Sequence, residues 1–131
     1  MREILFRGKR ADTGEWNWGN LVRRAKELLI VTLGFICGEV IPETVGQYTG
    51  LTDKNGKRIF EGDILIYVVD GEYDVNEKYL VVFDDDEAAF KVRFYYKGKF
   101  ACYDDIAPCE KLEIIGNIHD SPELLEGEHN G

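Results

Sequence analysis

The chain has 131 residues, a formal net charge of −9 and 44% hydrophobic residues, which fits one ordinary domain with a real core. It contains no apolar run of about 18 residues, so we expect no membrane-spanning helix. The N-terminal segment 1–7 lacks the apolar core and small-residue cleavage site of a secretory signal, so we expect a cytoplasmic protein.

The charge is unevenly distributed along the chain. Residues 1–30 carry seven basic and four acidic residues, whereas residues 66–131 carry six basic and sixteen acidic ones. An acidic half repels phosphate backbones, which disfavours general nucleic-acid binding. Two nucleic-acid roles stay open: acidic mimicry of DNA against a host protein, and direct binding through a basic patch. The patch would comprise Arg7, Lys9, Arg10, Arg23 and Arg24.

The N-terminal part is predicted to be a series of short strands. Residues 3–8 form one strand, and residues 16–21 form another with both tryptophans on one side. The segment 23–30 contains good helix formers, but its neighbours are β-rich. We therefore favour a hairpin there, with Leu28 to Cys37 as its second strand.

The segment 42–65 is dense in glycine and charge. Residues 42–48 predict one helical turn, with Val45, Tyr48 and Leu51 on one side and Gly50 ending it. Residues 53–57 predict a tight turn, because Asn-Gly readily adopts positive φ. A second bend precedes the strand that begins at residue 63. The residues expected to act structurally in these turns are Gly46, Gly50, Asn55, Gly56, Gly62 and Asp63.

The rest of the chain is also predicted to be mostly β. Residues 63–69 and 79–83 are nearly all apolar, as in strands covered on both faces. Residues 90–96 alternate with a period of two, and a turn at 97–99 joins them to an apolar run at 100–103, which predicts a hairpin. A strand at 112–118 and a short helix at 120–125 follow, the helix capped by Asp120 or Ser121. Residues 126–131 are a polar tail.

Known ligand-binding motifs fail when their spacing is tested. With Gly56 at position 6 of a calcium loop, positions 1 and 12 are Leu51 and Gly62, which offer no side-chain oxygen. A phosphate loop fails because Gly50 is one residue too far from Gly56 and Arg58 replaces the required hydroxyl.

Catalytic groups are equally hard to place. The odd set Cys37, Cys102 and Cys109 has no CxxC pair, so we expect reduced cysteines in apolar or half-buried positions. The acidic runs 84–87 and 104–105 are interpreted as solvated turns, and His119 as a surface residue. We predict no catalytic, cofactor-binding or metal-binding residue, no cofactor and no enzymatic activity. A composite site assembled from distant segments stays open.

Four segments together resemble one family. They are "REILFRGKR" (2–10), "GEWNWGNL" (14–21), "VIPETVGQYTGLTDKNGKRIFEGDIL" (40–65) and "LEIIGNIHDSPELL" (112–125), and they follow one another as in the YopX family of small phage- and prophage-encoded proteins. The resemblance implies a mainly β fold with an SH3-like β-barrel in the C-terminal part. Together with the short strands and the short C-terminal helix predicted from the residues, it leads us to expect one domain over 1–131, with an N-terminal β segment at 1–41, a turn block and barrel at 42–125 and a polar tail at 126–131. It brings no catalytic residues.

The function expected from these observations is that of a non-enzymatic phage or prophage accessory protein. It would act by binding an unidentified protein or a second copy of itself in the cytoplasm of the bacterial host, with no membrane partner. Nucleic acid is the disfavoured alternative. The residues expected on an interaction surface are Trp16, Trp18, Tyr48 and Arg58.

Overall fold

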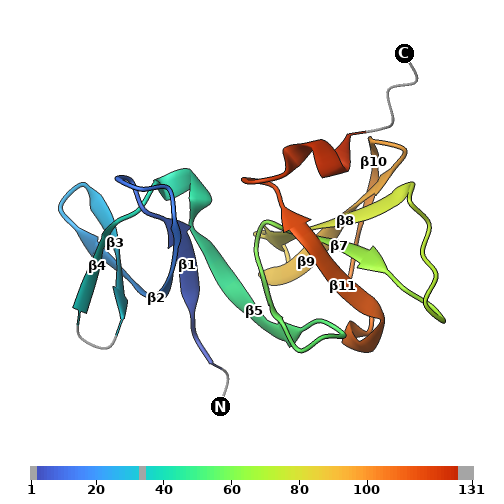
Figure 1. Ribbon diagram of the computed structural model, residues 1–131, viewed down its shortest axis with the longest axis horizontal. Coiled ribbons are helices and arrows are strands. Elements are labelled where there is room, and N and C mark those ends of the chain that lie inside the picture. Colours follow the sequence, from blue (N-terminus) through green and yellow to red (C-terminus); the bar gives the residue numbers. More distant parts are fainter. Residues whose placement is uncertain (1–2, 33–34, 127–131) are drawn as a thin grey trace. The chain divides into compact units, whose positions relative to one another are not determined.

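The computed structural model describes residues 3–32 and 35–126, except the side chains of residues 35–37. The fold is mainly β, as predicted, and consists of antiparallel strands in two sheets (Figure 1). The chain divides into two compact units, Met1–Gly50 and Leu51–Gly131. The prediction of a single domain stays a prediction.

The first sheet has the strand order β4-β3-β2-β1-β5-β6. Its strands are β1 (Phe6–Lys9), β2 (Trp16–Arg24), β3 (Glu27–Thr32), β4 (Phe35–Glu39), β5 (Gly46–Thr52) and β6 (Arg58–Phe60). The segment 23–30 belongs to a hairpin, as predicted, since Leu21 of β2 pairs with Ile30 of β3. The single strand expected from Leu28 to Cys37 is wrong, because the chain reverses and β4 pairs antiparallel with β3.

The helical turn after residue 41 is shorter than predicted. A 3-10 turn, η1, covers only Pro42–Thr44, and β5 begins at Gly46. Tyr48 and Leu51 therefore lie in a strand, and the common helical side proposed for Val45, Tyr48 and Leu51 is wrong. Gly50 lies inside β5 and ends no helix. The backbone N–H of Tyr48 donates to the carbonyl of Leu5, so the segment joins the sheet instead of a longer helix.

The second sheet has the order β10-β9-β8-β7-β11. Its strands are β7 (Asp63–Tyr67), β8 (Glu77–Asp84), β9 (Ala89–Tyr96), β10 (Lys99–Asp104) and β11 (Leu112–Asn117). The strand order runs from β10 to β11 without closing. The predicted short C-terminal helix is a 3-10 turn, η3 (Pro122–Leu125). Ser121 precedes it but makes no capping hydrogen bond with its side chain, and Asp120 instead accepts one from Asn117.

Hydrophobic clusters cover both faces of this sheet. Ile64 and Leu65 are consecutive in β7, so their side chains point to opposite faces, and both are 0% exposed. Leu65 packs with Ile59, Val81, Val92 and Leu112 in one cluster. Ile64 packs with Leu80 and Leu125 in the other. The nearly uninterrupted apolar sequence of β7 is thereby explained, as predicted for a strand buried on both sides.

The turn from 53 to 57 is organised by one buried carboxylate. Asp53 is 5% exposed, and its Oδ1 accepts backbone N–H groups of Asn55 and Lys57 at 2.9 Å each. Its Oδ2 accepts the backbone N–H of Ile114 in β11 at 3.1 Å. The backbone N–H of Lys54 adds a bond to the carbonyl of Leu112 at 2.8 Å. The turn is therefore fastened along the outer side of β11.

Replacing Asp53 tests this role. We expect Asp53→Ala to lower the free energy of unfolding by about 2–4 kcal/mol, because three backbone donors lose a charged acceptor. Asp53→Asn should lose less, since one oxygen remains. Urea denaturation measures both. Asp85→Ala, which removes an exposed acid from another turn, is the control and should leave the midpoint unchanged.

Two turn glycines separate the effect of backbone conformation from that of packing. Gly56 and Gly62 have φ of 80° and 90°, but a Cβ at Gly56 would meet nothing, whereas at Gly62 it would lie 3.3 Å from Nε2 of His119. We expect Gly56→Ala to cost about 1 kcal/mol of stability through φ alone. Gly62→Ala should cost more, as measured by thermal unfolding. Equal losses would contradict a packing contribution at Gly62.

Candidate binding surface on the β9–β10 hairpin

The hairpin of β9 and β10 presents the most exposed strand of the second sheet. Lys97 and Gly98 join the strands with φ of 52° and 81°, the pair of positive values required by a type I′ turn. All six residues of β10 are exposed. This strand lies at the edge of the sheet, with β9 as its only neighbour in the strand order.

A β-bulge changes which side chains of β10 share a face. Phe100 pairs with Tyr95 and Tyr103 pairs with Arg93, while the register shifts between Phe100 and Cys102. In a regular strand, residues 100 and 103 would point to opposite faces. The extra residue brings them to the same face, and their ring centroids are 5.2 Å apart in an edge-to-face arrangement.

Arg93 lies among these rings. Its guanidinium carbon is 4.5 Å from the ring centroid of Phe100, 5.6 Å from that of Tyr95 and 5.7 Å from that of Tyr103. We call Arg93, Tyr95, Phe100 and Tyr103 the Arg93 cluster. The Nε of Arg93 is buried and has no hydrogen-bond partner in the described structure. The cation therefore contacts three aromatic rings, an arrangement that stabilises a positive charge.

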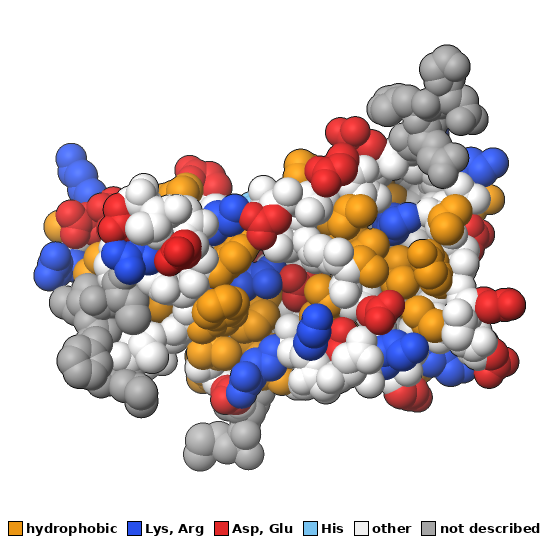
Figure 2. Space-filling view, in the orientation of Figure 1, with side chains coloured by type: hydrophobic (Ala, Val, Ile, Leu, Met, Phe, Trp, Pro, Cys, Tyr) orange, Lys and Arg blue, Asp and Glu red, His pale blue; other side chains and the backbone are white. Residues whose placement is uncertain are grey.

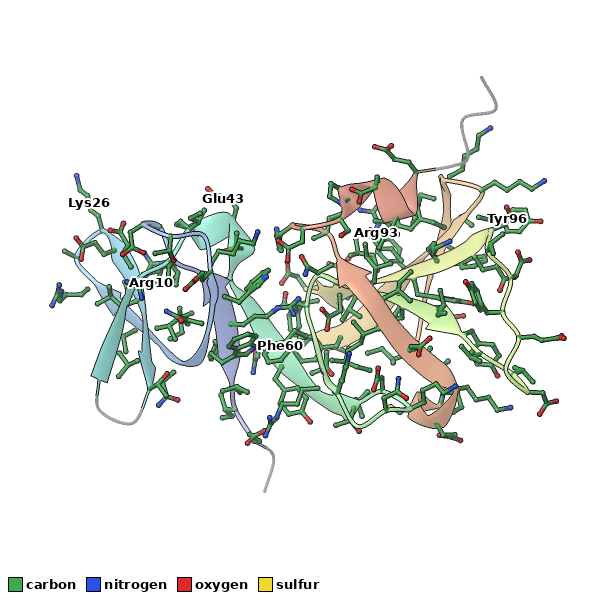
Figure 3. The ribbon with its side chains drawn as sticks, viewed as in Figure 1. Arg10, Lys26, Glu43, Phe60, Arg93 and Tyr96 are labelled. Carbon is green, nitrogen blue, oxygen red and sulfur yellow. The ribbon has the colours of Figure 1, made fainter. Side chains whose placement is uncertain are left out.

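A shallow pocket adjoins the cluster. It has a volume of about 450 Å³ and is lined by Val82, Phe83, Asp84, Asp85, Asp86, Arg93 and Tyr103. Residues 85–87 of the acidic turn are exposed, as predicted, and the turn borders a hollow that it shares with Arg93 and Tyr103. Figure 3 labels two residues of β9, Arg93 and the last residue of the strand, Tyr96. In the part of Figure 2 where Figure 1 places β8–β11, hydrophobic side chains are exposed between charged ones.

A lysine on the same strand fastens the flanks of the hairpin. The Nζ of Lys91 is 2.6 Å from a carboxylate oxygen of Glu87 and 2.6 Å from one of Asp105. Hydrogen bonds to Asp105 and Glu87 raise the pKa of Lys91 above its usual value. The bridge joins the β8–β9 turn to the segment after β10. Asp105 is thereby committed to a partner within the chain.

The four residues expected on an interaction surface lie in different surroundings. Trp18 is 49% exposed on β2, whereas Trp16 is half-buried and lies 4.7 Å below the guanidinium of Arg7. Tyr48 is only 8% exposed, which leaves its ring little surface for a partner. Arg58 is exposed at the start of β6. The structure does not bring all four together within either unit.

Several residues of the proposed basic patch are engaged within the chain. Arg7 is 8% exposed, and Lys9 also lies over Trp16 at 5.5 Å. Arg10 forms two hydrogen bonds with Asp12, and its guanidinium lowers the pKa of that carboxyl. Arg24 pairs with Glu27 at 3.5 Å. Arg23 is exposed.

The remaining candidate groups occupy structural positions. In residues 3–32 and 35–126, no three His, Cys, Asp or Glu side chains gather as they would around a metal ion. The expected half-buried position is confirmed for Cys109, whose pKa burial raises, but it is wrong for Cys102, which is an exposed free thiol because β10 is an uncovered edge strand. The side chain of Cys37 lies outside the described residues. Gly46 of β5 pairs with Arg7 of β1, and the carboxylate of Asp63 accepts the backbone N–H of Phe60.

The Arg93 cluster was missed by the sequence analysis, although one signal could have located its β9 half. The period-two pattern of residues 90–96 already places Arg93 and Tyr95 on one face. The same rule puts residues 100 and 103 on opposite faces. Because the bulge is not evident from the sequence, the β10 half of the cluster could not be predicted. Chemically, the cluster offers a cation, three aromatic rings and adjacent carboxylates, a combination suited to molecular recognition.

Comparison with known proteins places the chain in a family. The profile of the family described as "YopX protein" matches residues 9–126, and the chain belongs to this family. Among solved structures, it resembles protein EF1440 from Enterococcus faecalis, with 23% identity and a TM-score of 0.57. The match covers 96% of this chain and all of that one, and it supports the fold alone. A search of the curated proteins gave no match.

Within the described ranges, no helix has the length and apolar character needed to span a bilayer.

Removing the cation from its cluster should have a measurable effect. We expect Arg93→Met, which keeps an apolar stem of similar length, to lower stability by about 1–2 kcal/mol because the cation–aromatic contacts disappear. Arg93→Lys should recover part of the loss. Arg23→Met, at an exposed arginine of β2, is the matched control. Equal denaturation midpoints for wild type and Arg93→Met would contradict this role.

Proposed function

We propose that this protein is a phage or prophage accessory protein of the bacterial cytoplasm that acts by binding another protein molecule and catalyses no reaction. The observation that carries the proposal is the pair of exposed rings, Phe100 and Tyr103, in the Arg93 cluster. Phe100 is 43% exposed and Tyr103 is 58% exposed, although both are large rings. Aromatic residues and arginine are enriched in protein interfaces and in their energetic hot spots.

The phage or prophage context is proposed from membership of the YopX family, which the sequence resembles across four segments. A catalytic role has weaker support, because the cluster contains no recognisable pair of nucleophile and base. The exposed edge of β10 adds a second means of recognition, since unpaired backbone groups can accept an added strand. The partner is accordingly a protein with an accessible strand or an aromatic surface.

We infer further that the second unit is related to SH3-like barrels. Its five short antiparallel strands and the family resemblance support this assignment. Such small barrels present binding residues on hairpins while a buried strand supports them.

Affinity capture tests the binding role. The tagged wild type is compared with a Phe100→Ser, Tyr103→Ser double variant in lysate of a bacterial host, and each preparation is also examined by size-exclusion chromatography with light scattering. We expect a self-assembly or a captured protein that the double variant loses, because the rings supply most of the apolar contact.

A matched control uses Tyr73→Ser, another tyrosine that is 50% exposed. This variant should retain what the wild type binds. A wild type that is strictly monomeric and captures nothing would contradict the proposal, as would equal capture by the wild type and the double variant.

A further inference from the structure

We propose that β10 pairs antiparallel with β10 of a second copy of this chain, so that two five-stranded sheets join edge to edge across a two-fold axis. The inference rests on the proposed binding role of the β9–β10 hairpin and assigns its partner. Main-chain hydrogen bonds between edge strands supply the attachment, and facing side chains set the register.

The two edges of the second sheet are treated differently by the fold. The outer side of β11 is occupied by the turn at Asp53 and Lys54, through hydrogen bonds with Ile114 and Leu112. Within the described residues, no backbone group of β10 bonds to any strand or loop beyond β9, apart from local contacts at its end. The open edge is therefore that of β10.

The bulge makes the aromatic pattern of β10 symmetric. Counting Ala101 and Cys102 as one position, the strand has a centre with Phe100 on one side and Tyr103 on the other. A two-fold axis at this centre places Phe100 opposite the partner's Tyr103, and Tyr103 opposite the partner's Phe100. Since Phe100 and Tyr103 share a face within one chain, four rings gather on one face of the joined sheet.

The same axis matches the charges at the ends of the strand. Lys99 falls opposite Asp104 of the partner subunit, and the pair occurs twice by symmetry. Neither Lys99 nor Asp104 forms an ion pair with another described residue, whereas the neighbouring Asp105 is held by Lys91. Opposite charges facing each other across strands are stabilising, and like charges are destabilising.

Other alignments of two copies lose this match. Shifting the partner by one residue places Phe100 opposite the carboxylate of the partner's Asp104 in one direction, or opposite the partner's Cys102 in the other. Parallel pairing in register places Lys99 opposite Lys99 and Asp104 opposite Asp104. The charges thus favour the antiparallel two-fold arrangement over its alternatives.

Charged residues and bulges ordinarily discourage edge pairing. On β10 the charges and the bulge disfavour pairing with most strands. They favour pairing with an antiparallel copy of β10, because the strand has Lys99 at one end and Asp104 at the other. The contact is short, so its buried area falls below that of a permanent dimer and the association is reversible. Dimer formation should therefore depend on protein concentration.

A charge swap tests the register. Sedimentation velocity is run on the full chain from micromolar to millimolar concentration for wild type, Lys99→Asp, Asp104→Lys and the double variant. We expect the wild type to dimerise and each single variant to raise the dissociation constant about tenfold, because both facing pairs then carry like charges. The double variant restores opposite charges and should dimerise as the wild type does.

Hydrogen exchange gives a second reading on the wild type alone, independent of any variant. Backbone amides of residues 99–104 should exchange more slowly at dimerising concentration than at high dilution. A wild type that stays monomeric throughout the concentration range would overturn the inference. So would a dimer whose dissociation constant is unchanged by the single substitutions or is not restored in the double variant. A dimer in which the amides of β10 exchange as fast as in the monomer would overturn it as well. A monomer that still captures another protein through Phe100 and Tyr103 would overturn this inference and leave the proposed function standing.

Discussion

The second unit depends on the carboxylate of Asp53. It accepts hydrogen bonds from the backbone of its own turn and from Ile114, which lies 61 residues further along the chain. A single side chain therefore fixes a tight turn and seals the edge strand β11. Because that edge is sealed from within, the exposed ladder of the sheet is confined to its other end, at β10. The candidate surface therefore lies at β10 because the hydrogen bonds of Asp53 occupy the opposite edge of the sheet, at β11.

Burial of β7 on both faces imposes a second constraint. Leu65 and Ile64 belong to different hydrophobic clusters, so the sheet has a core above and below its centre. The burial of side chains decreases from β7 across β8 and β9, and every residue of β10 is exposed. Phe100 and Tyr103 therefore remain accessible although their neighbour Tyr95 packs against the second cluster. A strand with large rings, an open edge and no cover is arranged for contact with another molecule.

Most of the fold could be predicted from the sequence, because its signals are local. Alternation in residues 90–96, the apolar run at 63–69 and the Asn-Gly turn each specify structure within a few residues. The predictions failed where pairing between strands distant in the sequence determined the local structure. Residues 28–37 have the composition of one strand, yet antiparallel pairing divides them into β3 and β4. Val45, Tyr48 and Leu51 have helical spacing, yet Tyr48 is drawn into β5 by a backbone bond to Leu5.

The candidate surface was less predictable because it depends on one inserted residue. The bulge at Ala101 has no sequence signature here, and without it Phe100 and Tyr103 would lie on opposite faces. The same insertion centres a two-fold arrangement in which Lys99 faces an aspartate. An edge strand can resist general aggregation through charge and irregularity, or accept a specific partner through complementarity. On β10 the same residues can do both, because a strand with opposite charges at its ends repels a parallel copy and attracts a reversed one.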